Sequence, residues 1–390
     1  MLKIQSKLPA LGTTIFTQMS ALAAQVGAIN LSQGFPNFDC DARLQLLVTQ
    51  SMAAGKNQYA PMAGVLELRE RLAKKIARLY GQEYSAADEI TVTAGATQAI
   101  YTAIAALVHA GDEVVMIEPA YDCYRPAVEL CGATVRAYAL RADEGWRVDW
   151  QRFAALINER TRMVIINTPN NPSASLLRDE DLRALSALLQ NTNIVLLSDE
   201  VYEHLTFDGQ RHCSALGYAD LRERTLATFS FGKTLHATGW KLGYIVGAAP
   251  LMQEFRKVHQ YNVFCVNAPM QYAIASYLED ASTYLDLPAF FEQKRDFFRQ
   301  CVGDSLPLRW LPCEGTYFQI ADYSAVSEER DTDFAIRLTR EAGVAVIPLS
   351  VFYSQAPESQ RLVRICFAKT EDTLQRAAEQ LAAYFALIKN

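Results

Sequence analysis

Hydrophobic residues recur along this chain with two different spacings, and each spacing predicts a different element. Val65, Leu68, Leu72, Ile76 and Leu79 lie three or four positions apart, which places them on one face of a helix. The same spacing predicts a helix at the end of the chain, whose apolar positions include Leu374, Ala377, Leu381 and Tyr384.

Short runs without a polar face predict buried strands between about residues 60 and 250. These runs are Glu89–Thr93, Glu113–Ile117, Met163–Ile166, Ile194–Leu197 and Thr225–Phe229. The intervals between them, about 20 to 45 residues, leave room for helical crossovers and therefore imply parallel pairing. We expect an α/β fold in which a mostly parallel sheet is covered by helices.

The two ends of the chain contain fewer such runs. We expect residues 1–45 and 286–390 to form one small α+β domain built from both termini. This domain would pack against a large domain that spans residues 46–285. No internal repeat and no Pro/Gly-rich linker marks the boundaries.

The composition narrows the functional classes. Half of the 390 residues are hydrophobic, 21% are charged, and the formal net charge is -6, as in globular proteins that bind neither nucleic acid nor anionic membranes. The N-terminus lacks the apolar core of a secretory signal, and no apolar stretch is long enough to span a membrane. The eight cysteines form no CxxC pair and no zinc-like spacing, so we expect free thiols, no metal and a cytoplasmic location.

Candidate chemistry follows the predicted strands, because ligands of open α/β sheets bind beyond the carboxyl ends of the strands. Gly95, Ala96 and Thr97 form a small-residue turn that opens into a helix, and helix N-termini favour phosphate. After another strand, two prolines make a rigid turn that presents Asn171, whose amide can donate to a phenolate oxygen. Taken singly, each motif is also typical of a turn that binds nothing.

Two further strand ends carry ionisable groups. Asp199 ends a buried strand, and a buried carboxylate requires a partner such as the protonated nitrogen of a pyridine ring. Tyr202, three residues later, can reach the same phenolate oxygen as the amide. Lys233 can bond covalently to an aldehyde, while Ser230 and Lys241 offer a hydroxyl and a cation to a phosphate. A single lysine in such a loop is usually structural, but the combination predicts a site for pyridoxal 5'-phosphate.

The order of these motifs, an Asn-Pro turn, Asp-x-x-Tyr, then Ser-x-x-Lys with a cation eight residues later, resembles that of a known family. It is similar to the fold-type I pyridoxal phosphate enzymes of the class I/II aminotransferase superfamily, over nearly the whole chain. The resemblance implies that Gly95, Ala96 and Thr97 bind the phosphate and that Tyr121 stacks on the cofactor ring.

Within the superfamily, the chain most resembles the methionine and kynurenine aminotransferases, which include glutamine transaminase K. The segments that carry this likeness are Ser32–Pro36, Asn57–Tyr59, Tyr121–Tyr124, Ala237–Lys241 and Val363–Lys369. Two positions depart from the usual pattern. Lys241 stands where many aminotransferases have arginine, as it also does in this group, and Ala174 replaces the glycine usual after the Asn-Pro turn.

The resemblance also implies a substrate site. Arg364 would bind the α-carboxylate of an amino acid through two parallel hydrogen bonds, with Asn171, Gly34 and Phe35 also contacting the substrate. The side chain would enter a pocket of apolar and aromatic residues, for which the candidates are Phe16, Phe35, Tyr59, Tyr121 and Phe352. Methionine is the favoured substrate, followed by phenylalanine, tyrosine, tryptophan, histidine, glutamine and kynurenine.

The same resemblance implies an assembly and a reaction. Tyr59 would reach the phosphate of the neighbouring subunit, in a homodimer with two shared sites. The reaction would be a ping-pong transamination from an amino acid to a 2-oxo acid, with Lys233 as both tether and general acid/base. The alternatives are a cysteine-conjugate or cystathionine β-lyase and, more remotely, a non-catalytic effector-binding module. The effector-binding module would require an N-terminal DNA-binding domain. The aminotransferase pattern begins by about residue 30, so we expect no such domain before it.

Overall fold

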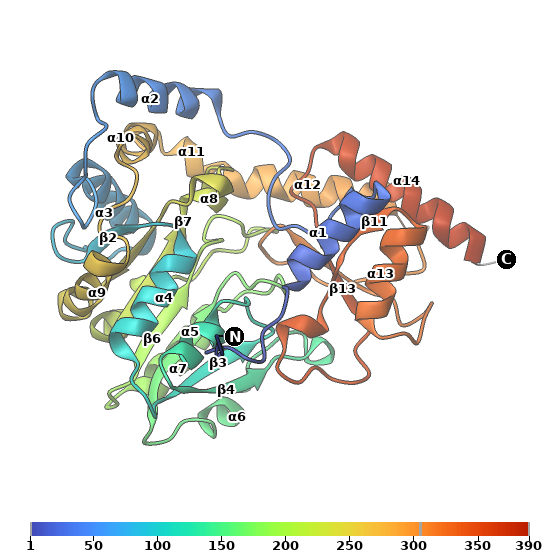
Figure 1. The fold of residues 1–390 in the computed structure, drawn as a ribbon, viewed down its shortest axis with the longest axis horizontal. Helices are drawn as coiled ribbons and strands as arrows, with labels where there is room; N and C mark the ends of the chain where they lie inside the picture. Colours follow the sequence, from blue (N-terminus) through green and yellow to red (C-terminus); the bar gives the residue numbers. More distant parts are fainter. Residues whose placement is uncertain (1, 304–305, 389–390) are drawn as a thin grey trace.

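A seven-stranded sheet forms the centre of this computed structural model, which describes residues 2–303 and 306–388 (Figure 1). The strand order across the sheet is β2-β8-β7-β6-β5-β3-β4. The bounds are β2 Ile90–Thr93, β3 Glu113–Glu118, β4 Thr134–Ala139, β5 Thr161–Asn167, β6 Val195–Asp199, β7 Thr225–Ser230 and β8 Gly243–Gly247. All five predicted strands are confirmed, as β2, β3, β5, β6 and β7.

Two strands of the sheet were not predicted. β4 lies at an edge and is mostly half-exposed, so its sequence is not apolar on both faces. β8 is short, has glycine at both ends, and pairs antiparallel with both β2 and β7. The expectation of parallel pairing is therefore wrong for β2, whose hydrogen-bonded neighbour is β8, and it holds for the pairs from β7 to β4.

The reversed direction of β8 determines what lies at the carboxyl edge of the sheet. Gly243, its first residue, pairs with Thr93 at the end of β2 and with Ser230 at the end of β7. A Cβ atom at Gly243 would lie 2.5 Å from the carbonyl oxygen of Phe229, so the three strands approach too closely for a side chain here. The segment that precedes β8 therefore lies at the same edge as the ends of β2 and β7.

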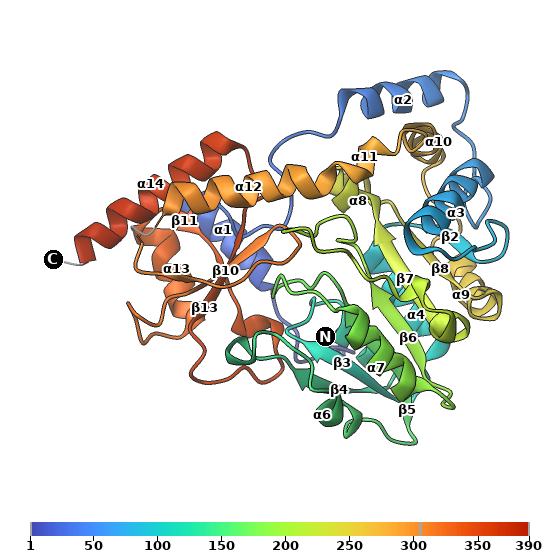
Figure 2. The same ribbon diagram turned by 180° about the vertical axis from the view of Figure 1, so that it is seen from behind.

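Helices cover both faces of the sheet. One face packs against α4 (Ala96–Leu107), α5 (Tyr124–Leu130) and α9 (Ala249–Asn262), and α4 lies over the sheet in Figure 1. The other face packs against α3 (Leu66–Tyr80) and α7 (Asp179–Leu189), and α7 lies over it in the reverse view (Figure 2). The helix predicted from the spacing of Leu68, Leu72 and Ile76 is confirmed as α3, where all three are fully buried.

The two ends of the chain meet beside this sheet. β1 (Ile29–Asn30) pairs in parallel with β11 (Val344–Ala345), and α1 (Ile15–Val26) packs against α13 (Asp331–Glu341). A separate four-stranded antiparallel sheet has the order β12-β13-β10-β9, with bounds β9 Arg309–Trp310, β10 Phe318–Asp322, β12 Ile347–Pro348 and β13 Leu362–Cys366. The domain boundaries given above stay a prediction.

The predicted C-terminal helix is confirmed as α14 (Glu371–Ile388), and its expected apolar positions are all buried. It packs against α12 (Leu287–Val302), which runs from the large sheet toward the small one (Figures 1 and 2). The remaining α-helices are α2 Ala42–Ala53, α6 Trp150–Ala154, α8 Phe231–Thr234, α10 Ala268–Tyr277 and α11 Ser282–Leu285. Within residues 2–303 and 306–388, no helix combines the length and the apolar character needed to cross a membrane.

Candidate active site

A pocket with about 670 Å³ of empty space opens at the carboxyl edge of the large sheet. It is lined by ten residues expected from the sequence to bind the cofactor: Gly95, Ala96, Thr97, Tyr121, Asn171, Asp199, Tyr202, Ser230, Lys233 and Lys241. They meet because β5, β6 and β7 are neighbouring parallel strands, and because antiparallel β8 brings its preceding segment to the same edge.

One end of the pocket is built to attract an anion. Gly95, with φ of +80°, precedes α4, and the first N–H groups of a helix have no partner within the helix. Lys241 Nζ would lie 3.5 Å from a Cβ atom on Gly95, so the ammonium is close to this helix start. Ser230 adds a hydroxyl at the end of β7. The helix dipole, the ammonium and the hydroxyl together suit a phosphate group.

Asp199 is a buried carboxylate that lacks a cationic hydrogen-bond partner in the part of the chain that the structure describes. It ends β6 with 3% of its surface exposed. Tyr124 donates to Oδ2, and the backbone N–H of Val201 donates to Oδ1 at 3.2 Å. Burial raises the pKa of Asp199 to about 6, against the lowering effect of these two donors. A protonated ring nitrogen would supply the missing positive charge.

Asn167 and Tyr124 were not identified from the sequence as site residues. Asn167 donates from Nδ2 to the carbonyl of Asp199 at 2.9 Å and accepts the backbone N–H of Asn171 at 2.8 Å. It therefore joins the two strand ends. Tyr124 belongs to the segment Tyr121–Tyr124 that carries the family likeness. Nothing in the sequence showed that its hydroxyl reaches Asp199, 75 positions away.

Lys233 follows β7 in the short helix α8, and its side chain is partly buried. Nζ donates to the carbonyl oxygen of Gly34 at 3.1 Å and to the hydroxyl of Tyr317 at 2.9 Å. Burial lowers the pKa of Lys233 to about 8, and the positive charges of Arg364 and Lys241 act in the same direction. A substantial fraction of this amine is therefore neutral near pH 8, as a nucleophile or base requires.

Arg364 is not part of the pocket lining but contacts it through Asn171. Nη1 donates to Oδ1 of Asn171 at 2.6 Å, and Nη2 donates to the carbonyl of Ser32 at 3.0 Å. The guanidinium lies 3.9 Å from the ring centre of Phe318 and is 1% exposed. Burial lowers the pKa of Arg364 to about 10. It stays charged at neutral pH, and no carboxylate is among its hydrogen-bond partners in the described chain.

The remaining predicted residues lie at different distances from the Arg364 guanidinium. The ring centres of Phe16 and Phe352 are 5.8 Å apart, and both rings flank Arg364. Gly34 has no room for a side chain, because a Cβ atom would lie 2.9 Å from Phe318 Cζ. Phe35 is 44% exposed. Tyr59 is 83% exposed and packs edge-on against Phe264, outside the pocket of its own chain.

Ala174, the unusual residue after the Asn-Pro turn, adopts a left-handed backbone with φ of +60°. Glycine takes this conformation without strain, whereas alanine does so at a cost of about 1 kcal/mol. The methyl group is fully buried. The departure thus leaves the left-handed turn in place.

The residues of the pocket fit pyridoxal 5'-phosphate. The phosphate, the ring nitrogen and the aldehyde of the cofactor require an anion-binding end, a buried carboxylate without a cation and a lysine with a lowered pKa, and the pocket has all three. Asn171 accepts from Arg364 through its carbonyl oxygen, which leaves the amide N–H groups for the cofactor's phenolate.

Comparison with known proteins gives concordant results. The family described as aminotransferase class I and II matches residues 26–381. Methionine aminotransferase of Escherichia coli K12 is 55% identical over 378 residues, 97% of each chain. Human kynurenine–oxoglutarate transaminase 1 is 32% identical and covers 92% of this chain and 93% of its own. A crystal structure of an Escherichia coli methionine aminotransferase, 54% identical, covers 98% of this chain and 100% of its own with a TM-score of 0.95.

Proposed function

Because this chain belongs to the class I and II aminotransferases, which use pyridoxal 5'-phosphate, we propose that it transfers the amino group of methionine to a 2-oxo acid. The fold-type I architecture expected from the sequence is confirmed. The observation that carries the choice of substrate is the 55% identity, over 97% of both chains, to a methionine aminotransferase. Amino acids with aromatic or other apolar side chains would be secondary substrates.

The surroundings of Arg364 support this choice. Its buried guanidinium binds the α-carboxylate, and the rings of Phe16 and Phe352 beside it suit a thioether or an aromatic side chain. Among the described residues that line the pocket, Lys233 and Lys241 are the only cations. Both have other roles in the proposed site, so a substrate with a second carboxylate would find no cation for it there.

Five side chains carry out the proposed reaction. The bound cofactor supplies a ring that accepts electrons when a bond at the substrate Cα breaks. Lys233 takes the Cα proton at Nζ and returns it at the aldehyde-derived carbon of the cofactor, and in the second half of the cycle it carries a proton in the reverse direction. Asp199 keeps the ring nitrogen protonated, Tyr202 donates to the phenolate with Asn171, and Arg364 fixes the orientation of the substrate.

Single-turnover measurements with each of the twenty amino acids test the substrate assignment. The loss of the cofactor's absorbance band should be fastest with methionine, and a faster reaction with aspartate would contradict the proposal. Release of pyruvate from cysteine conjugates, compared with 2-oxo acid exchange, tests the alternative β-lyase activity.

Arg364→Lys should lower kcat/KM for methionine by roughly 10- to 100-fold, because an ammonium cannot make two parallel hydrogen bonds to a carboxylate. The decisive comparison uses 3-(methylthio)propylamine, which is methionine without its carboxylate. The wild-type enzyme should prefer methionine strongly, and the variant should lose most of this preference. Arg361→Lys, next to the same strand, serves as the control. An unchanged preference in Arg364→Lys would exclude the proposed carboxylate contact.

We infer that Tyr59 completes the site of a second copy in a symmetric homodimer. Its exposed ring packs against Phe264, which is itself 42% exposed and lies three residues after the exposed Tyr261. Tyr59→Phe should weaken binding of pyridoxal phosphate about tenfold by removing one hydrogen bond to the phosphate.

Mixed dimers test whether the site is shared. At a limiting concentration of pyridoxal phosphate, Lys233→Ala and Tyr59→Phe subunits should each have low activity alone. A dimer of the two has one site with both an intact Lys233 and an intact Tyr59 only if Tyr59 acts across the interface. Since one of its two sites is then intact, the mixed dimer should have about half the activity of a wild-type dimer. No recovery, or an active monomer in equilibrium sedimentation, would refute the shared site.

A further inference from the structure

Tyr317 contacts Lys233 directly, although nothing in the sequence pointed to it. The phenol hydroxyl accepts an N–H of Lys233 Nζ at 2.9 Å and donates its own proton to the carbonyl oxygen of Gly34 at 2.5 Å. That carbonyl accepts a second N–H of Lys233 at 3.1 Å. Three distant segments of the chain therefore meet at one amine.

The backbone just before Tyr317 is held in place. Thr316 adopts a left-handed conformation with φ of +66°, which is strained for a β-branched residue. Its N–H donates to the carbonyl of Leu205 at 2.9 Å. A Cβ atom on Gly315 would lie 2.5 Å from the same carbonyl. This backbone is therefore pressed against the segment that follows Tyr202.

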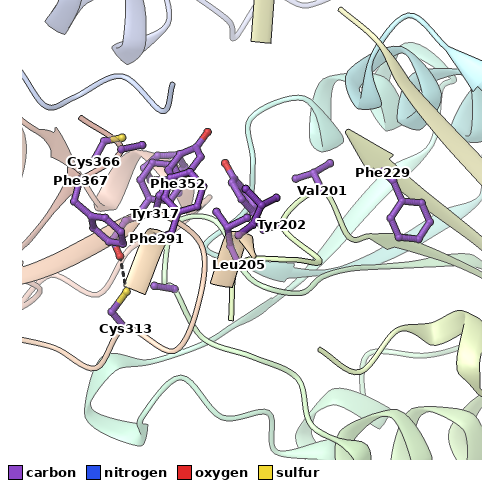
Figure 3. Close-up of a cluster of buried hydrophobic side chains, with 14 of the residues drawn as sticks. Val201, Tyr202, Leu205, Phe229, Phe291, Cys313, Tyr317, Phe352, Cys366 and Phe367 are labelled. Atoms are coloured by element: carbon purple, nitrogen blue, oxygen red, sulfur yellow. Dashed lines mark hydrogen bonds between the residues drawn. The ribbon is translucent and has the colours of Figure 1, made fainter. Parts of the chain in front are cut away.

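The ring of Tyr317 is fully buried in an apolar cluster (Figure 3). Its centre lies 5.2 Å from that of Tyr202, 5.7 Å from Phe291 and 4.9 Å from Phe318. Packing of this kind holds an aromatic ring in one rotamer. The hydroxyl is thus presented to Lys233 by a rigid group.

The carbonyl of Gly34 is held equally firmly. Lys369 donates from Nζ to the carbonyls of Phe35 at 2.7 Å and Gln33 at 3.4 Å. The carbonyl of Ser32, two residues before Gly34, accepts a hydrogen bond from Arg364. Since the peptide groups on both sides of Gly34 are fixed, its own oxygen has little freedom to turn away from Lys233.

A neutral lysine amine has two N–H bonds and one lone pair. We propose that Tyr317 is a positioning residue, which together with the carbonyl of Gly34 occupies both N–H bonds of Lys233 and leaves the lone pair for the substrate's Cα proton. Because the hydroxyl of Tyr317 gives its proton to Gly34, it does not compete for that lone pair. This inference rests on the proposed role of Lys233 as the base.

Tyr317→Phe keeps the packed ring and removes only the hydroxyl. We expect kcat for methionine to fall about 10- to 30-fold, with KM within about twofold, since the lost hydrogen bond orients the amine rather than binding the substrate. The primary isotope effect with Cα-deuterated methionine should rise, because proton transfer becomes slower than the other steps. The cofactor-free variant should also recombine more slowly with pyridoxal phosphate, a reaction that uses the same lone pair.

Tyr323→Phe is the matched control, because Tyr323 is also fully buried and donates to a backbone carbonyl, that of Glu329 at 2.8 Å. It should leave all three measurements unchanged. The hydroxyl of Tyr317 also interacts with that of Tyr202. The effect of Tyr317→Phe should therefore persist in a Tyr202→Phe background if it acts through Lys233, and its disappearance there would overturn the inference.

Exchange of the Cα proton of methionine with deuterated solvent separates this inference from the proposed function. If Lys233→Ala abolishes exchange while Tyr317→Phe leaves exchange, kcat and the isotope effect unchanged, the positioning role of Tyr317 is refuted and Lys233 remains the base. If Lys233→Ala still exchanges the proton at the wild-type rate, Lys233 is not the base, and both proposals fall.

Discussion

Lys233→Ala should lower the rate of methionine transamination by about 10⁴-fold, because no other group in the proposed mechanism can take the Cα proton. The cofactor should still bind through the phosphate end of the pocket and Asp199, but without a covalent attachment. Steady-state turnover measures the loss. Borohydride reduction followed by mass spectrometry should add the cofactor to the Lys233 peptide of the wild-type protein and to no peptide of the variant.

The pKa of Lys233 adds a pH dependence to this prediction. With a pKa of about 8, the amine is protonated and unreactive at lower pH and neutral at higher pH. The rate at which the cofactor-free wild-type protein takes up pyridoxal phosphate should therefore rise up to about pH 8 and then level off, since the neutral fraction of the amine sets the rate. Lys257→Ala, which removes an exposed lysine, is the control. Full turnover in Lys233→Ala would show that the assignment is wrong.

Asp199→Asn should reduce kcat by about 10²–10³-fold with little change in KM for methionine. The amide occupies the same volume but has no charge to keep the ring nitrogen protonated, so the charge that develops in the transition state loses its main electrostatic stabilisation. In the wild-type protein, cofactor affinity should fall as the pH is lowered through about 6, because the carboxylate of Asp199 becomes neutral. This fall in cofactor affinity near pH 6 should be absent from the pH profile of Asp199→Asn.

Asp331→Asn provides a matched control for Asp199→Asn. Asp331 is equally buried, accepts from a hydroxyl and a backbone N–H of Ser350, and also has a pKa raised by burial. It does not line the pocket, so its substitution should affect stability more than kcat. Equal losses of kcat in the two variants would mean that Asp199 has no special role at the ring nitrogen.

The parts of the site that the sequence predicted are those that follow strands. Asp199 is the last residue of β6, and Asn171 and Lys233 follow β5 and β7. Parallel neighbours bring these strand ends together wherever the intervening helices lie. Lys241 was predicted from its spacing of eight residues from Lys233. The reason for its position, the antiparallel strand β8, was missed because the strand is short and bounded by glycines.

The contacts that the sequence did not predict join residues far apart in the chain. Tyr317 lies 84 positions from Lys233 and 283 from Gly34, and no periodic pattern encodes such distances. Arg364 was expected through a family resemblance alone, and its bond to Asn171 spans 193 positions. Tertiary packing of the small sheet against the large one determines these contacts, so they required the three-dimensional structure.

The pairing of β1 with β11 can form only late in the synthesis of the chain. Ile29 and Val344 are paired although they are 315 positions apart, and translation at roughly 5–20 residues per second needs about 15–60 s to cover that distance. A nascent chain that has emerged as far as β8 already holds every residue lining the cofactor pocket. Its first strand still has no partner. The contact between Tyr317 and Lys233 cannot form until the last quarter of the chain has been made.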